Sequence, residues 1–150
     1  MTYIIDDKDK KIIEILQEHG DFTTRQIAKK TLIPPTTINN RIRKMKKEGI
    51  IKNFTVNLDY KKINKGFLVY ILVSADISTL KEKNKSQYDV VKELMKYDFI
   101  EKADIVSGGT DIVATVRVKD VDEFDKALLG KIQNTEGVGN TQSLIVIHQR

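Results

Sequence analysis

Several residue types are missing or rare in this chain. It has no cysteine and no tryptophan, and only two histidines and two prolines in 150 residues. Without cysteine, neither a disulfide framework nor a thiolate-ligated metal site can form. The histidines, His19 and His148, fall in different predicted domains, so we expect each to be an ordinary surface residue. We therefore expect no metal, no cofactor and no catalytic residue.

Long apolar runs are also missing. No stretch approaches the ~18 apolar residues that span a bilayer, so we expect no membrane partner. The N-terminal residues, MTYIIDDKDKK, lack the basic-then-apolar order of a signal peptide, which favours a cytoplasmic protein. A content of 40% hydrophobic and 31% charged residues is typical of a folded globular chain.

Acidic residues are scarce in one window of the chain. Between positions 23 and 53 there are nine Lys or Arg residues against one acid, Glu48, a local charge of +8. The whole chain carries +5, so the remainder sums to −3. A basic charge confined to one region is typical of a protein that binds nucleic acid.

The basic window and the segment before it predict three short helices. Acids from Asp6 onward begin the first, and Gly20 follows its end. Thr23-x-x-Gln26 is a capping box for the second, which must end before the two prolines that follow. The third runs from about Pro35 to Glu48. Three helices with a short turn before the third predict a helix-turn-helix.

The third helix has two different sides. At 100° per residue, Ile38, Ile42 and Met45 form one stripe, which we expect to be buried. The side chains that face away from it or flank it are our candidates for DNA contact: Thr36, Thr37, Asn40, Arg41, Arg43, Lys44 and Lys47. Threonine and asparagine can read base edges, and the cations can hold phosphates. The alternative is an ordinary solvated basic helix, which the helix-turn-helix context disfavours.

The chain then divides. Residues 50–56 predict a strand, either a wing or a connector, and the polar stretch 57–66 predicts a linker. We therefore expect a DNA-binding domain over residues 1–56 and a second domain over residues 67–150.

The second domain has the order β-α-β-β-α-β, which predicts a ferredoxin-like fold and an α+β protein overall. The predicted strands are residues 67–73, 100–107, 112–118 and 142–148, and the helices are residues 86–97 and 120–132, with a turn at 137–140. The inner stripes of these helices are predicted to be Tyr88, Val91, Leu94 and Met95, then Val121, Phe124, Leu128 and Ile132.

Two helices cover only one face of a four-stranded sheet. The first strand, FLVYILV, is nevertheless apolar on both faces. An uncovered apolar face is too large for a stable monomer, so we expect a homodimer that packs sheet against sheet. Two DNA-binding heads would then read two half-sites of double-stranded DNA.

These halves resemble the Lrp/AsnC (feast/famine) transcription regulators over nearly the whole chain. The motifs that carry the match are Asp6-x-x-Asp9-x-x-Ile12, Ile38-x-x-Arg41-Ile42-x-x-Met45-x-x-x-Gly49-Ile50-Ile51, Ile100, Val106-Ser107-Gly108-Gly109-Thr110-Asp111, Gly137-Val138 and Thr141. The resemblance implies a sequence-specific regulator whose dimers often assemble into octamers and which responds to amino acids.

The resemblance also implies an effector site at contacts between C-terminal domains. The loop that matches it is Ser107, Gly108, Gly109, Thr110 and Asp111. Backbone groups at the two glycines can hold an α-carboxylate or amine, with Asp111 nearby. The alternative is a plain hairpin turn that Asp111 caps.

The chain departs from the family pattern at four positions. Leu32 and Pro34 stand where Gly and Ser are common, which removes an expected side-chain cap before the third helix. Within the effector loop, Thr110 replaces the aromatic residue that is usual before the Asp, and Asp21 replaces a common basic residue before the second helix. The changes at Leu32 and Pro34 affect the turn, the change at Thr110 affects effector binding, and the change at Asp21 removes one phosphate contact.

Two other functions compete with DNA binding. The first is an amino-acid-sensing regulatory subunit of a metabolic enzyme, because ferredoxin-like domains serve that role; the basic third helix counts against it. The second is an acylphosphatase-like hydrolase. The sequence shows neither a convincing phosphate cradle nor a nucleophile beside a base, so we expect a protein that is not an enzyme.

Overall fold

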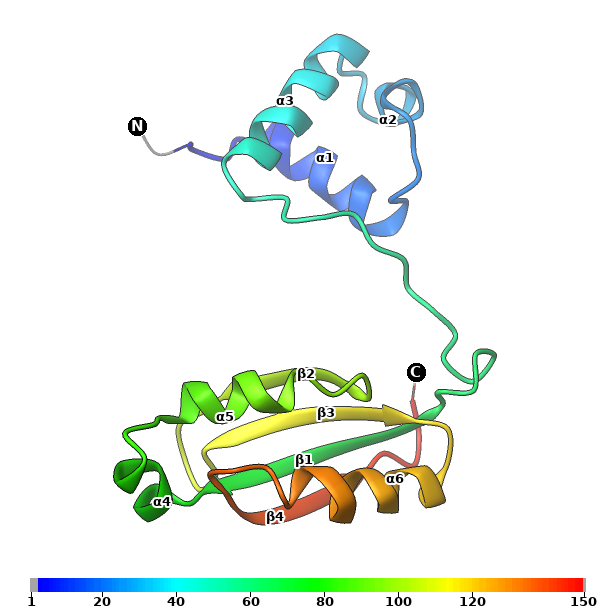
Figure 1. Ribbon diagram of the computed structural model, residues 1–150. Helices are drawn as coiled ribbons and strands as arrows, with labels where there is room; N and C mark the ends of the chain where they lie inside the picture. The colour runs from blue at the N-terminus through cyan, green and yellow to red at the C-terminus, as the bar shows by residue number, and fades with distance from the viewer. Residues whose placement is uncertain (1–2, 150) are drawn as a thin grey trace. The chain divides into compact units, whose positions relative to one another are not determined.

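The computed structural model describes residues 3–149. The chain divides into two compact units, residues 1–58 and 59–150. The first unit is helical, and the second packs helices on a four-stranded sheet (Figure 1). The predicted α+β fold is confirmed. Residues 59–65, which the predicted linker included, form turns within the second unit.

The N-terminal unit contains three helices, α1 (Asp7–Glu18), α2 (Thr24–Thr31) and α3 (Pro35–Lys47). Capping boxes begin α1 and α2: the side chains of Asp6 and Thr23 each accept the backbone N–H of the residue three positions on, and their own backbone N–H groups donate to the side chain of that residue. The buried apolar residues that hold the three helices together are Ile12, Ile27, Ile33, Ile38 and Met45. The predicted buried stripe of the third helix is confirmed at Ile38 and Met45, and Ile42 is partly buried against them.

The strand predicted at residues 50–56 is wrong. Residues 52–58 have neither helical nor strand structure, and within residues 3–149 no second strand pairs with them. The β-branched and aromatic residues favour an extended chain, but a strand needs a hydrogen-bonded partner to persist. Gly49, with φ of 72°, ends the helical region as a left-handed residue.

The C-terminal unit is an antiparallel sheet of strand order β2-β3-β1-β4. Its strands are β1 (Phe67–Ala75), β2 (Ile100–Ile105), β3 (Ile112–Val118) and β4 (Val138–Ile145). Its helices are α4 (Ile77–Glu82), α5 (Gln87–Leu94), α6 (Val121–Ala127) and the π-helical turn η1 (Leu128–Ile132). This is the ferredoxin-like order, with α4 as an additional short helix.

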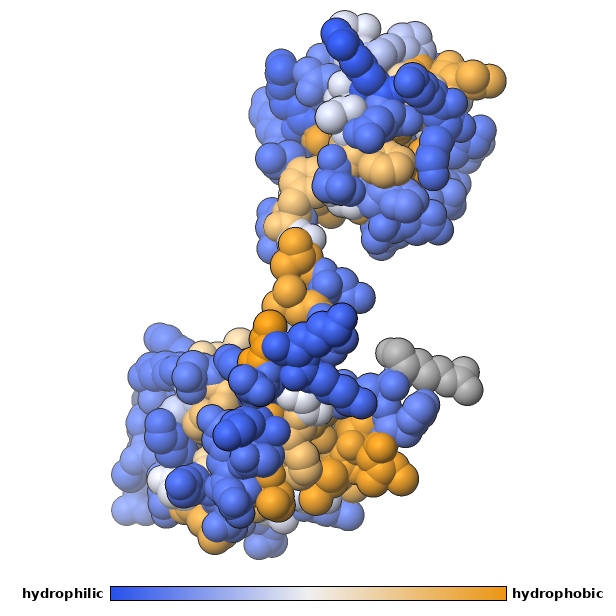
Figure 2. Space-filling view, turned by 90° about the vertical axis from the view of Figure 1, so that its right-hand side faces the viewer, coloured by the Kyte–Doolittle hydropathy of each residue, from blue (hydrophilic) through white to orange (hydrophobic). Residues whose placement is uncertain are grey.

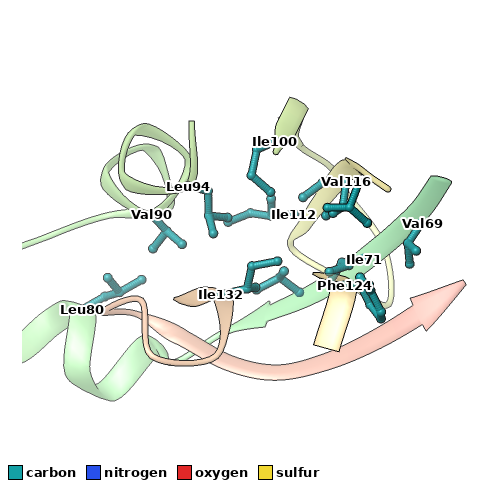
Figure 3. Packing of buried hydrophobic residues seen from close by; sticks show 13 residues of the cluster. Val69, Ile71, Leu80, Val90, Leu94, Ile100, Ile112, Val116, Phe124 and Ile132 are labelled. Atoms are coloured by element: carbon teal, nitrogen blue, oxygen red, sulfur yellow. The ribbon is translucent and has the colours of Figure 1, made fainter. Parts of the chain in front are cut away.

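One face of this sheet carries the core. In β1, Val69, Ile71 and Val73 are fully buried and pack against apolar residues of β2, β3 and the helices (Figure 3). In β3, Ile112 and Val116 point to the same side. Both α5 and α6 lie against this single face, which leaves the opposite face of the sheet uncovered within the described residues (Figure 1).

The uncovered face carries a group of apolar side chains. Tyr70 pairs with Leu144 of β4, and Leu72 pairs with Val113 of β3, so these four side chains alternate with the core residues of their strands. Tyr70 is 40% exposed and Leu144 is 44% exposed. Figure 2 shows hydrophobic residues gathered on one side of this unit. We call Tyr70, Leu72, Val113 and Leu144 the open face.

Some predicted packing is wrong. Tyr88 and Met95 of the α5 region and Val121 of α6 are exposed, whereas Val90, which was not in the predicted stripe, is buried. The α5 helix ends at Leu94 and buries a narrower stripe than its apolar content suggested. The unpredicted α4 is capped by Asp76 and buries Leu80.

The last strand begins earlier than predicted. Val138 and Asn140 belong to β4, where the glycine-rich sequence predicted a turn. Gly139 lies so close to β1 that a Cβ there would approach the carbonyl oxygen of Ser74 to 2.8 Å. This glycine therefore allows close strand pairing beside a bulge in β1, and it is not a turn residue.

Within residues 3–149, no helix combines the length and apolar character needed to cross a membrane.

Candidate nucleic-acid interface

The turn before α3 provides no side chain that caps the helix. Leu32 ends α2 in the left-handed conformation, with φ of 58°, and its side chain is 92% exposed. Ile33 then enters the core. Pro34 is the N-cap and makes no side-chain bond, and Pro35 occupies the first helical position, where it lacks only an N–H that would be unpaired anyway. The two prolines therefore begin α3 by fixing φ.

The α3 helix is anchored on one side only. Ile38 and Met45 are fully buried, and Ile42 packs against the same core. The side chains that lie opposite are exposed: Thr36, Asn40, Arg43, Lys44 and Lys47. Thr37, on a flank, is half-buried. The arrangement leaves hydroxyl, amide and cationic groups on one continuous solvent-facing surface, which we call the outer face of α3.

Cations gather toward the C-terminal end of this surface. Lys44, Lys46 and Lys47 lie in the last turn of α3, where the helix dipole stabilises positive charge. The Lys44 ammonium also lies 4.7 Å from the centre of the Tyr3 ring, and the Lys46 ammonium 5.5 Å from that of Phe54. These contacts hold the lysine side chains against the unit while their charges remain in solvent.

Arg41 requires a correction. We expected it to be a phosphate contact, but its Nη1 lies 2.7 Å from both carboxylate oxygens of Asp6 and 2.9 Å from Oδ1 of Asp9. The Arg41 side chain is only 24% exposed and that of Asp9 only 1%. Arg41 therefore points toward the start of α1, and its charge is already neutralised within the unit.

A hollow of about 420 Å³ lies beside this ion pair. Thr37, Asn40 and Lys44 line one side of it, and Tyr3 and Asp6 line the other. The structure thus brings the N-terminal residues of the chain next to candidate base-reading residues. Sequence reasoning missed Tyr3 and Asp6, although Asp6 and Asp9 stand out as paired acids ahead of an apolar run.

The predicted effector loop lies at one end of the sheet. Ser107, Gly108 and Gly109 are exposed, and a Cβ added at Gly109 would meet nothing within 4 Å. Thr110 is half-buried, and its hydroxyl donates to the Val73 carbonyl at 2.9 Å. The glycines are therefore accessible, whereas Thr110 is bonded to β1.

Asp111 is engaged in the fold. Its Oδ2 accepts the Ala75 backbone N–H, and its Oδ1 accepts the Gln87 side-chain amide, both at 2.8 Å. Its own N–H donates to the Val73 carbonyl at 3.0 Å. The carboxylate thus joins β1, the start of β3 and α5, and neither of these two bonds caps its own hairpin turn. Whether it also contacts a ligand stays a prediction.

A concave surface of about 470 Å³ adjoins this loop on the open side of the sheet. Gly109 and Thr110 line it together with side chains that the sequence did not single out as ligand candidates: Leu72, Ser74, Asn140, Thr141 and Gln142. Leu72, Ser74, Asn140 and Gln142 alternate with core residues along β1 and β4, which is the signal that could have placed these four on one face; Thr141 pairs with the core residue Val73. The lining is uncharged, so any ligand charge would be met by backbone groups or by another chain.

Known families match both units. Residues 5–52 match a model described as winged helix-turn-helix DNA-binding, and residues 72–150 match the Lrp/AsnC ligand binding domain. The HTH-type transcriptional regulator FL11 of Pyrococcus furiosus is 34% identical, over 98% of this chain and 92% of that protein. The regulator of the same name from Pyrococcus horikoshii is 35% identical over the same shares.

Solved structures share the fold. AsnC of E. coli superposes with a TM-score of 0.84 at 24% identity, covering 98% of this chain and 95% of that chain. A transcriptional regulator of Neisseria meningitidis, solved as a complex with L-Met, gives a TM-score of 0.85 at 22% identity, covering 97% of this chain and 92% of that chain.

Proposed function

This chain is a DNA-binding helix-turn-helix regulator of the Lrp/AsnC family, and we propose that a dimer of it docks the α3 helix of each protomer in successive major grooves. The observation that carries this proposal is the two-sided α3: Ile38 and Met45 are fully buried, and the outer face of the helix is polar and cationic. A helix of this kind fits the width of the major groove of B-DNA.

Within the outer face, the residues divide by chemistry. Thr36 and Asn40, with Thr37 on the flank, would read bases, because a hydroxyl can meet a base edge or a thymine methyl and an amide can pair bidentately with adenine. Arg43, Lys44 and Lys47 would hold the phosphate backbone. Arg41 is left out of this set because Asp6 and Asp9 occupy its Nη1.

Dimerisation would use the open face of the C-terminal sheet. A monomer would leave the apolar side chains of Tyr70 and Leu144 in water and that of Leu72 partly exposed. A second copy packed sheet against sheet would bury them symmetrically, since an interface with a twofold axis uses the same patch on both protomers. Further assembly of dimers into octamers would use other surfaces.

An amino acid would regulate this assembly. Support comes from the concave surface beside Gly109 and Thr110, and from the family's ligand-binding domain over residues 72–150. Exposed backbone groups at Gly108 and Gly109 would hold the α-carboxylate or amine. The role proposed for the ligand is regulatory, not catalytic: it would favour one arrangement of dimers and hence one spacing of DNA heads.

The test begins with selection of a duplex from random DNA by the full-length protein. Affinity for that operator and its single-base variants is then measured by fluorescence anisotropy. Asn40→Ala should cost about 1–3 kcal/mol and relax preference at one position. Lys47→Gln should weaken all sequences alike and reduce the salt slope by about one unit per protomer. Selection that enriches no sequence would overturn the proposal.

The effector is tested separately, by thermal melting of the full-length protein in the presence of each free amino acid. A ligand at a hundred times its dissociation constant should raise the free energy of unfolding by about 2.7 kcal/mol. If no amino acid shifts the melting temperature, the protein is a regulator that acts without this class of ligand.

A further inference from the structure

Arg41 lies in a hydrogen-bonded network that joins two helices. Its Nη1 bonds Asp6 and Asp9, at the start of α1, across 35 and 32 residues of sequence. The remaining Asp9 oxygen, Oδ2, accepts the Tyr3 hydroxyl at 2.8 Å and the Asp6 backbone N–H at 3.1 Å. One side chain of α3 is thus bound to the N-terminal turn of α1 at several points.

The direction of Arg41 takes it away from the surface proposed to meet DNA. At 100° per residue, Thr36, Asn40 and Lys47 cluster within about 40° of one another, and Arg41 lies about 120° around the helix from their centre. The guanidinium of Arg41 contacts the start of α1, in agreement with this direction. A phosphate that contacts the outer face of α3 would not be the natural partner of such a side chain.

The charges of the network also disfavour a phosphate. One guanidinium faces two carboxylates, so the positive charge of Arg41 is already balanced and is not free to attract an anion. Hydrogen bonds from the Asp9 backbone N–H and from Arg41 lower the pKa of Asp6 to about 2, so its charge persists at neutral pH. The nearly buried Asp9 depends on Arg41, because an unpaired buried carboxylate is strongly destabilising.

We propose that Arg41 is a positioning residue, which fixes the orientation of α3 on α1 so that Thr36 and Asn40 meet their bases in register. The inference rests on the proposed DNA-binding function. Because Arg41 would act on the whole helix, its loss should weaken discrimination at every base position together. A base contact would affect one position, and a phosphate contact would affect all duplexes equally.

The experiment compares three variants of the full-length protein. Asp6→Asn removes a charge from the network but keeps an N-cap, since Asn caps as well as Asp. Arg41→Lys keeps the positive charge but removes the planar guanidinium. Asp7→Asn is the matched control, because Asp7 lies next to Asp6 but its carboxylate pairs with Lys10 at 3.2 Å, so the variant loses the same charge outside the network. Affinities for the selected operator, its single-base variants and a scrambled duplex are measured by anisotropy between 50 and 200 mM salt.

The ratio of operator affinity to scrambled-duplex affinity should fall about tenfold in Asp6→Asn and in Arg41→Lys, which corresponds to about 1.4 kcal/mol of lost base contact. The loss should be spread over all base positions. Affinity for the scrambled duplex should persist in both variants, which an unfolded head would not retain. Asp7→Asn should leave the ratio within about twofold.

Three results would overturn the inference. Tighter binding of every duplex by Asp6→Asn, with a steeper salt dependence, would show that releasing Arg41 creates a phosphate contact. Loss of discrimination at a single base pair in Arg41→Lys would make Arg41 a base contact. Unchanged ratios in both variants would show that the network does not position α3. Failure of the wild-type protein to prefer any duplex would instead overturn the proposed function.

Discussion

The N-terminal unit keeps Thr, Asn and cations on the side of α3 that its core does not use, whereas the C-terminal unit keeps Tyr70, Leu72 and Leu144 on the sheet face that its helices do not cover. In both units, one side of the helix or sheet forms the core and the other side is free to bind a partner. The chemistry of the free side differs between the units, however. A polar, cationic helix suits a polyanion, and an apolar sheet suits a second apolar sheet.

The units also differ in how much core supports the available surface. Among residues 3–149, the principal buried cluster has five apolar residues in the first unit and thirteen in the second. A small core supplies little more than about 3–5 kcal/mol of stability. The DNA-binding head should therefore be the less stable unit, and loss of one core residue should affect it more.

The largest expected effect tests that difference directly. Ile38→Ala in α3 and Ile71→Ala in β1 each truncate a fully buried isoleucine and should each cost about 2–5 kcal/mol. Ile38→Ala should unfold the N-terminal unit at 37 °C and leave the C-terminal unit intact. Ile71→Ala should lower the melting temperature of the C-terminal unit without unfolding it. Amide NMR spectra of the full-length variants would resolve the two units, and equal losses would contradict the comparison.

The next effect concerns the apolar surface. Leu144→Glu places a carboxylate on the open face, and an interface that buries it unpaired should lose about 3 kcal/mol, or more than a hundredfold in association. Sedimentation equilibrium measures that loss. Tyr88→Glu is the matched control, because Tyr88 is an exposed hydrophobic residue on α5. If both variants associate like the wild type, the dimer does not use this face.

A smaller effect is expected at the turn before α3. Leu32 has φ of 58° and an almost fully exposed side chain, so it bears backbone strain with little burial in return. Leu32→Gly should raise the free energy of unfolding of the N-terminal unit by about 1 kcal/mol. Leu32→Ala should give no comparable gain, because it keeps a Cβ. Chemical denaturation measures both, and a gain in Leu32→Ala as large as in Leu32→Gly would refute strain as the cause.

The smallest effect is on acid stability, and it should be similar in the two units. The pKa of Asp6 is lowered to about 2 by the Asp9 backbone N–H and by Arg41, and that of Glu136 is lowered to about 2 by Lys83 and Lys85. A lowered pKa in the folded state stabilises the fold above the unfolded pKa of about 4. That contribution is lost as the pH falls from about 4 toward 2.

Two variants assign this loss to each unit. Asp6→Asn should flatten the dependence of stability on pH below 4 in the N-terminal unit, and Glu136→Gln should do so in the C-terminal unit. Denaturation of the full-length protein at intervals between pH 2 and 5, followed by NMR, gives both curves. A variant curve as steep as the wild-type curve would show that the altered carboxylate does not contribute.

Much of the fold could be predicted because its signals are local. Capping boxes at Thr23 and Ser86 lie three residues from their partners, and the buried stripe of α3 follows from the 3.6-residue period. The alternation in β1 predicted an apolar face left uncovered by two helices. Each of these features depends on residues within one helical turn or one strand, so it can be recognised from the order of residues in the sequence.

The remaining features depend on groups distant in sequence. Arg41 has the composition and spacing of a phosphate contact, and only its approach to Asp6 and Asp9 in three dimensions changes that interpretation. Residues 50–56 have strand-forming side chains, but no partner strand within the described residues. Asp111 could be recognised as a cap or as a ligand group, and its bonds to Ala75 and Gln87 were needed to establish its role in the fold.

Two glycines near the same end of the sheet differ in how freely evolution can replace them. At position 139 any side chain would collide with the backbone of β1, so substitution would push β4 away from β1. At position 109 a new side chain would enter open space next to the uncharged hollow. Descendants of this protein can therefore reshape the hollow by changing residue 109, while glycine at residue 139 keeps β4 paired with β1.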